Sequence, residues 1–220
     1  GVGLSRFGIC KRPDDISIKQ AMAAVGQGIL MQIYEKAFSE YGRVVGQILI
    51  TKEDIFYYDR NTNAKNTFNA LFNYNVIPIV NDKENLDCNR NNSGKVIYWN
   101  PGDEIKIGDN DVLSAYVAKL IDGDLLILLS DIDGLYDKDP SEEGAKFIPR
   151  VYEIDEGIRN IAKGAGSAFG TGGMKTKINA AKIALDNRID MVIANGERPD
   201  NIYDIVAGKA IGTLFRGREQ

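Results

Sequence analysis

The 220-residue sequence contains no histidine. This absence excludes catalytic triads and dyads in which histidine is the base, zinc sites of the HExxH type and histidine-ligated haem. Any proton transfer or charge stabilisation must therefore come from carboxylates, lysine, arginine, tyrosine, backbone amides or a metal ion held by oxygen atoms.

Cysteine, long apolar runs and positive charge are also scarce. Only Cys10 and Cys88 occur, far apart and in no CxxC pair, so we expect free thiols in a reducing compartment and hence a cytoplasmic protein. No apolar run reaches about eighteen residues and no charged-then-apolar leader opens the chain, which predicts no membrane span. The formal net charge of −4 offers no basic footprint, so we expect no nucleic-acid partner.

The residues that are present favour an α/β fold. Hydrophobic residues make up 44% of the chain, which suits one domain with a substantial core. Helical periodicity alternates with short apolar runs, which predicts a mainly parallel sheet. One predicted helix follows Asp14-Asp15 and stops at Gly42. Others cover 65–75, a segment that starts near Val112 and includes Leu120, the region of 158–161, 177–184 and 200–206. The predicted strands cover 44–50, 76–80, 125–129, 191–194 and 211–215.

The first long helix and the strand over 125–129 carry specific burial predictions. The helix is expected to bury one side, marked by Met22, Val25, Ile29, Ile33 and Phe38. Leu125 to Leu129 is an unbroken apolar run, typical of a strand that is buried on both faces of a parallel sheet.

Two polar clusters flank that strand. Asp109-Asn110-Asp111 precedes the helix before it, and Ser130-Asp131-Ile132-Asp133-Gly134 follows the strand itself. Ligands in open α/β sheets bind at the carboxyl ends of the strands, so both clusters are candidate sites. The alternative is structural: Asp109 caps the helix with Asp111 in its first turn, and Asp131 and Asp133 only form a turn.

A glycine-rich stretch, GTGGMKTK from Gly170 to Lys177, is a third candidate. Glycine lets backbone amides approach a ligand, and a helix N-terminus adds partial positive charge, while Lys177 could contact terminal phosphates. The stretch matches neither the Walker A nor the Rossmann pattern. Its alternative interpretation is a flexible loop with an ordinary surface lysine.

The polar segment 85–104, which contains Trp99, is either a lid or a solvated insertion without a role.

Together the three candidates combine anion binding, orienting groups and a shelf for a nucleotide. Phosphoryl transfer depends mostly on positioning and charge neutralisation, so it suits a chain without histidine.

The motifs GDNDVLSAYVA, SDIDGLYDKDP, GTGGMKTKINAAKIA and IGTLF, in this order, resemble those of the glutamate 5-kinases of the amino acid kinase superfamily. The kinase domain of pyrroline-5-carboxylate synthase is equally similar, and the similarity spans nearly all of Gly1 to Phe215. It implies an open, mainly parallel sheet between helix layers. It also implies transfer of the ATP γ-phosphate to the side-chain carboxylate of L-glutamate, the first step of proline biosynthesis, with Mg²⁺ accompanying ATP. Proline as a feedback inhibitor and a homo-oligomer are further expectations.

The resemblance also implies roles for single residues. Asp111 would orient lysines and the phosphoryl group, and Lys177 would stabilise the transition-state charge. The substrate would be bound by Asn110 and by the turn that contains Asn81 and Glu84, although Glu84 stands where the family has Asp. The nucleotide would be bound by Ser130, Asp131, Thr171, Gly172, Gly173, Met174, Lys175, Thr176 and Lys177. No metal ligands are assigned.

The resemblance further predicts a single kinase domain over residues 1–220 that is incomplete at its N-terminus. The family's first strand with its KxG[ST] turn, and the serine of its SGA loop, do not occur in the sequence. Little or no activity is therefore expected of this chain. No PUA domain is expected after the kinase domain. The alternatives are another kinase of the same fold, acting on UMP or acetylglutamate, or a non-catalytic amino-acid sensor.

Overall fold

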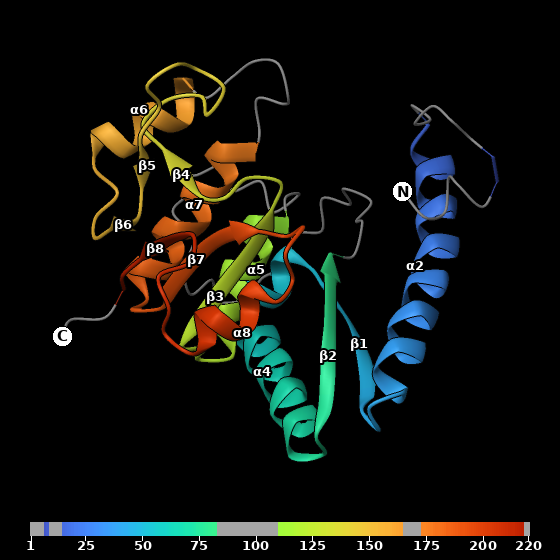
Figure 1. Ribbon diagram of the computed structural model, residues 1–220. Helices are drawn as coiled ribbons and strands as arrows, with labels where there is room; N and C mark the ends of the chain where they lie inside the picture. The colour runs from blue at the N-terminus through green and yellow to red at the C-terminus, as the bar shows by residue number, and fades with distance from the viewer. Residues whose placement is uncertain (1–6, 9–14, 83–109, 165–172, 218–220) are drawn as a thin grey trace. The chain divides into compact units, whose positions relative to one another are not determined.

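The computed structural model describes residues 7–8, 15–82, 110–164 and 173–217 (Figure 1). They fall into two compact units, Gly1–Asp103 and Glu104–Gln220, which are described separately here. The first contains α2 (Ile16–Ser39), β1 (Val44–Ile50), α3 (Lys52–Phe56), α4 (Tyr58–Asn73) and β2 (Val76–Asp82). The second contains α5 (Asn110–Leu120), β3 (Leu125–Ser130), β4 (Leu135–Tyr136), β5 (Phe147–Ile148), β6 (Arg150–Val151), α6 (Glu156–Gly164), α7 (Gly173–Asp186), β7 (Asp190–Asn195), α8 (Asn201–Val206) and β8 (Thr213–Phe215).

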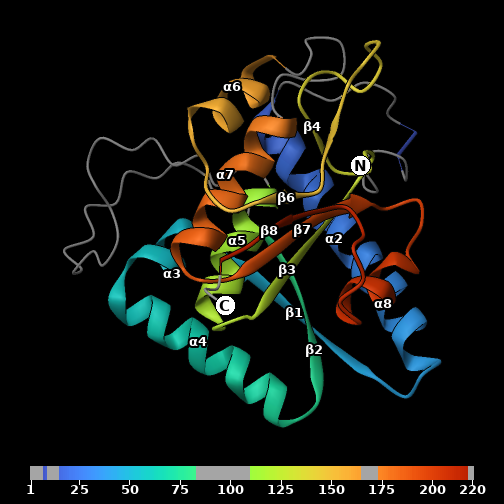
Figure 2. The ribbon, with the colours of Figure 1, turned by 60° about the vertical axis from the view of Figure 1, so that its left-hand side comes forward.

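The first unit is built around two parallel strands. β1 pairs with β2 from Val44 opposite Val76 onward, and the crossover between them runs through α3 and α4. Figures 1 and 2 show α2 and α4 on opposite sides of this pair. Helix α2 begins as predicted, because the Asp15 carboxylate accepts a hydrogen bond from the Ile18 amide at 3.0 Å. It ends before Gly42, whose φ of +65° suits a residue without a side chain.

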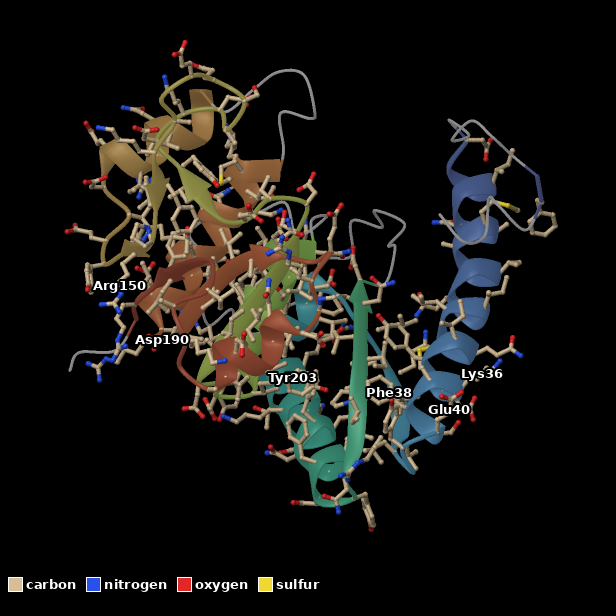
Figure 3. The ribbon with its side chains drawn as sticks, viewed as in Figure 1. Lys36, Phe38, Glu40, Arg150, Asp190 and Tyr203 are labelled. Carbon is tan, nitrogen blue, oxygen red and sulfur yellow. The ribbon has the colours of Figure 1, made fainter. Side chains whose placement is uncertain are left out.

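The predicted buried side of α2 is only partly correct. Phe38 is half-buried and points toward β1, whereas Lys36 and Glu40 point away from the strands (Figure 3). Val25 and Ile33 are exposed, by 37% and 56%, so their predicted burial is wrong. In the described part of this unit, α2 packs mainly against β1, and a two-stranded sheet is too narrow to cover the whole apolar stripe of a helix.

The second unit contains a four-stranded sheet in the order β3-β7-β8-β6. β3 and β7 are parallel, β6 and β8 are parallel, and β7 and β8 are antiparallel. Helices α5 and α7 pack against each other and share one core with the side chains of β3 and β7 that face them. Helix α8 packs on Val192 and Ala194, which point to the other face of β7.

Strand β3 is less buried than its sequence predicts. Leu128 is buried with the α5–α7 core, but Leu125 and Leu129 are 37% and 44% exposed. β3 is an end strand of the four-stranded sheet, and its exposed leucines lie on the face where the short helix α8 is the packed helix. Burial on both faces is therefore wrong for β3 within the described unit.

The IGTLF motif has a structural explanation. The Thr213 side chain is fully buried; its hydroxyl accepts a hydrogen bond from the Leu135 amide at 2.7 Å and donates one to the Ile148 carbonyl at 2.6 Å. It thereby links β8 to both strands of the β4–β5 hairpin. Gly212 has φ of +69°, and a Cβ there would collide with the Ile193 carbonyl oxygen. Glycine is therefore required for two independent reasons.

An α/β fold with mainly parallel strand pairs is confirmed. The antiparallel pairings among the described residues are β7–β8 and the β4–β5 hairpin, both in the second unit. A single domain over residues 1–220 stays a prediction, and the predicted lid at 85–104 lies outside the described residues. Among the helices that the structure describes, none has both the length and the apolar character needed to cross a membrane.

Candidate functional site

Helices α5 and α7 approach each other through small side chains. Ala115 and Ala118 of α5, and Ala180, Ala181 and Ala184 of α7, are all buried in one core. Alanines at helical spacing let two helix axes come close. This packing brings the first turn of α5, which begins at Asn110, to the first turn of α7, which begins at Gly173.

At that junction Asp111 and Lys177 form an ion pair. The Lys177 Nζ lies 3.0 Å from the Asp111 Oδ2, and the two side chains are 14% and 19% exposed, respectively. An ion pair with so little solvent contact is screened less by salt than one on the open surface. The Asp111 carboxylate also lies in the first turn of α5, where the helix dipole favours negative charge. The structure thus brings together the two residues that were predicted to be catalytic.

Thr176 lies at the same carboxylate. Its Oγ1 is 2.9 Å from the Asp111 Oδ2 and also 2.9 Å from the Gly173 carbonyl oxygen. Thr176 and Lys177 are consecutive in the chain, so the first turn of α7 presents a hydroxyl and an ammonium group to one carboxylate oxygen.

A second polar cluster lies at the carboxyl ends of β3 and β7. These strands are parallel with Ser130 opposite Asn195, so the turns that follow them meet at one edge of the sheet. The Ser130 hydroxyl donates to the Asp131 Oδ1 at 2.9 Å, and the Asn195 Nδ2 donates to the Asp133 Oδ1 at 2.9 Å. The Gly196 amide donates to the Ser130 carbonyl at 2.7 Å. Two links therefore hold the two turns together.

Asn195 was missed as a site residue by the sequence reasoning. The available signal was its position: it directly follows the predicted strand 191–194 and is itself followed by glycine, as a turn residue would be. Only the parallel register of β3 and β7 places it opposite the predicted nucleotide turn.

Asn81 lies at the end of β2 in the first unit. Its Nδ2 donates to the Gln27 Oε1 at 3.0 Å, and its Oδ1 accepts from the Asp82 amide at 2.9 Å. Gln27 lies in α2 between Gly26 and Gly28, and no sequence pattern pointed to its contact with Asn81. Gly26 is buried, whereas Gly28 is exposed and a Cβ there would meet nothing within 4 Å.

The other predicted site residues have less specific surroundings. Asn110 is exposed at the start of α5, Lys175 is exposed on α7, and Met174 packs on the α5–α7 core. Glu84, Thr171 and Gly172, together with Asp109, lie outside the described residues.

The arrangement of acidic and thiol side chains decides whether the protein alone could hold a metal ion. Within the described part of the chain, no three Cys, Asp or Glu side chains are grouped so that they could hold a metal ion. A cage built only from protein side chains therefore does not fit these residues. Mg²⁺ in phosphoryl-transfer sites is held largely by the phosphates of the substrate and by water, an arrangement that requires no such cage.

A profile of the amino acid kinase family matches residues 4–195. The chain belongs to the amino acid kinase family. Among curated relatives, it is similar to a glutamate 5-kinase from Clostridium acetobutylicum, at 52% identity over 216 residues that cover 98% of this chain and 76% of the relative. A glutamate 5-kinase from Clostridium tetani is 50% identical with the same coverage of both chains. The resemblance drawn from the four motifs is thus confirmed.

Solved structures of this amino acid kinase fold are similar at much lower identity. Isopentenyl phosphate kinase from T. acidophilum, in a product complex, matches with a TM-score of 0.56 at 18% identity, over 98% of this chain and 78% of that one. A likeness at this identity shows the fold alone, and it supports the α/β class assigned from the sequence.

Proposed function

We propose that this protein transfers the γ-phosphoryl group of ATP to the side-chain carboxylate of L-glutamate. The products are L-glutamyl 5-phosphate and ADP, and the reaction is the first step of proline biosynthesis. The observation that carries the proposal is the Asp111–Lys177 pair at the start of α7, in a chain that is about half identical to glutamate 5-kinases.

The absence of histidine fits this reaction. A glutamate side chain has a pKa of about 4.3, so the acceptor is already a carboxylate anion near neutral pH and needs no general base. One of its oxygens attacks the γ-phosphorus, the bond to the β–γ bridging oxygen breaks, and ADP leaves with that electron pair. Catalysis then consists of holding the two substrates in line and stabilising the charge on the transferred group.

The described residues divide this work. The start of α7 at Gly173 presents backbone amides and the positive end of the helix dipole to the phosphates. Lys177 stabilises negative charge on the phosphoryl oxygens, and Asp111 holds the Lys177 ammonium group in place. The turn of Ser130 and Asp131 receives the nucleotide. Mg²⁺ would arrive with ATP and neutralise phosphate charge; no step here depends on a protein-held ion.

The glutamate-binding residues are assigned by motif position. Asn110 is assigned to glutamate by motif position, and its exposure beside Asp111 is compatible with that role. Asn81 is assigned to glutamate by motif position, and Glu84 by the same motif. Inhibition by proline and a homo-oligomer stay predictions of the family resemblance, and a cytoplasmic location stays a prediction from the two cysteines expected to be free thiols.

An acceptor comparison tests the proposal. The full-length protein is incubated with ATP, Mg²⁺ and either glutamate, acetylglutamate or UMP, and acceptor-dependent ADP release is measured. We expect release with glutamate, together with an acyl phosphate that hydroxylamine traps as a hydroxamate. No glutamate-dependent release, or a higher kcat/KM with UMP or acetylglutamate, would overturn the proposal.

A variant pair then tests the role of Lys177. Lys177→Ala is expected to lower kcat on the order of a hundredfold or more, because it removes a preorganised cation from the site. Lys182→Ala is the matched control: Lys182 is on the same helix and pairs with Asp186 at 2.7 Å, but this pair is exposed and belongs to no candidate site. Equal kcat in the two variants would exclude Lys177 from the catalytic step.

A further inference from the structure

Thr176 belongs by sequence to the glycine-rich stretch that is expected to bind phosphates. Its side chain is engaged elsewhere in the structure. The Thr176 Oγ1 lies 2.9 Å from the Asp111 Oδ2, the same oxygen that accepts from the Lys177 Nζ at 3.0 Å. One carboxylate oxygen is therefore bound by two consecutive residues of α7.

The hydroxyl has one proton and two acceptors within reach. The second is the Gly173 carbonyl oxygen, also at 2.9 Å. A hydrogen bond to an ionised carboxylate is roughly twice as strong as one between neutral groups, so the Asp111 oxygen is the preferred acceptor. The Gly173 carbonyl is the alternative acceptor, on the preceding turn of the same helix.

We propose that Thr176 is a positioning residue for phosphoryl transfer, which fixes the Asp111 carboxylate so that Asp111 in turn holds the Lys177 ammonium group. This inference deepens the proposed function and rests on it for its kinetic part. Thr176 then does not bind phosphate; together with Asp111 it positions the catalytic lysine, Lys177.

The physical reason lies in the requirement for preorganisation. An isolated aspartate–lysine pair can exchange between several staggered rotamers, and the ammonium group moves with each exchange. A second donor on the same oxygen, from the residue adjacent to the lysine, restricts the carboxylate to the rotamer that serves both donors. Electrostatic stabilisation of a transition state depends on such a fixed charge and is sensitive to displacement by about 1 Å.

The test compares Thr176→Val, which keeps the shape of the side chain and removes the hydroxyl, with Thr176→Ser, which keeps the hydroxyl. We expect Thr176→Val to lower kcat about tenfold or more, as the loss of a hydrogen bond to a charged group does, while KM for ATP and the melting temperature stay close to wild type. Thr176→Ser should restore kcat. Ser114→Ala is the matched control. The Ser114 hydroxyl donates to the backbone carbonyl of Asp111 at 2.7 Å, so its removal takes a hydrogen bond from the same residue but not from the carboxylate.

Each alternative role for Thr176 gives a different result. If KM for ATP rises in Thr176→Val while kcat holds at saturating ATP, the hydroxyl binds nucleotide and the proposal is wrong. If kcat of Thr176→Ser falls as far as kcat of Thr176→Val, or if both variants have a lower melting temperature than the wild type, the role of Thr176 is packing and the proposal is equally wrong. Unchanged kinetics in both variants would also overturn it.

A measurement without substrate separates this inference from the proposed function. The ¹⁵N signal of the Lys177 ammonium group reports on its pairing with Asp111 whether or not glutamate is the acceptor. We expect the signal to shift or broaden in Thr176→Val and to return in Thr176→Ser. If the wild type phosphorylates no glutamate, the proposed function fails, and this signal still decides the contact network; the same signal in all three proteins would refute the role of Thr176.

Discussion

Replacing the buried Thr213 with valine separates packing from hydrogen bonding. If packing alone matters, stability should hardly change; if the hydrogen bonds matter, stability should fall. The Thr213 hydroxyl accepts from the Leu135 amide at 2.7 Å and donates to the Ile148 carbonyl at 2.6 Å, and both Thr213 and Leu135 are 0% exposed. Valine has nearly the same shape and volume. Thr213→Val therefore removes two hydrogen bonds and leaves the packing almost unchanged.

The expected cost follows from the groups that lose their partner. A buried polar group without a hydrogen bond costs about 1–3 kcal/mol, and the Leu135 amide has no exposure through which water could replace the hydroxyl. Ile148 is half-buried, so water recovers part of the cost at its carbonyl. The sum is about 2–4 kcal/mol, which for a chain of this size lowers Tm by roughly 5 to 15 °C.

The assay is chemical and thermal unfolding of the wild type, Thr213→Val and Thr213→Ser. Serine keeps both hydrogen bonds and loses one methyl group, which costs only about 1 kcal/mol. The predicted order of stability is wild type, then serine, then valine. Hydrogen exchange adds a local readout, because the Leu135 amide should lose protection in Thr213→Val and keep it in Thr213→Ser.

The reverse order would refute this reasoning. If Thr213→Val is as stable as the wild type and Thr213→Ser is the weaker variant, then packing determines the position and the two hydrogen bonds contribute little. A functional consequence is also expected. Leu135 directly follows the turn of Ser130 to Gly134, so the loss of its hydrogen bond should loosen that turn. Thr213→Val should therefore raise KM for ATP more than KM for glutamate.

Three further predictions concern the site and its frame. Asp111→Asn in the full-length protein should lower kcat on the order of a hundredfold with a loss of stability of only about 0.5–2 kcal/mol; near wild-type kcat would contradict the role of this carboxylate. Asn195→Ala removes the hydrogen bond to Asp133 and should raise KM for ATP but not KM for glutamate, and an equal rise in both would argue against a nucleotide turn. Gly212→Ala should destabilise the protein clearly more than Gly208→Ala in urea unfolding, because both residues have positive φ but only Gly212 lies against a main-chain carbonyl; equal losses would show that the contact is easily relieved.

Several features of this protein follow from local sequence. The start of α2 at Asp15 and its end before Gly42 were predicted correctly, because a cap and a positive-φ glycine act within one helical turn. Helix α3 was missed even though its signal was local: Thr51 and Asp54 form a capping box. The motifs likewise predicted the family, since they depend on residue type and order and not on contacts.

The burial of individual strands and helices could not be predicted from the local sequence. The apolar run of β3 is the same whether a strand lies in the middle or at the end of a sheet, and the four-stranded order places β3 at the end. The antiparallel direction of β8 against β7 also left no local trace, because a strand of three residues pairs equally well in both directions until its neighbours decide.

The candidate site shows the same division. The sequence by itself determined which groups are available: a carboxylate at the start of one helix, a lysine at the start of another, and polar turns after two strands. Asp111 and Lys177 are 66 residues apart, and Asp133 and Asn195 are 62 apart, so no local pattern relates them. Only the close packing of α5 on α7 and the parallel register of β3 with β7 brought these partners within hydrogen-bond distance, because such contacts depend on how whole elements pack and not on the residues beside them in the chain.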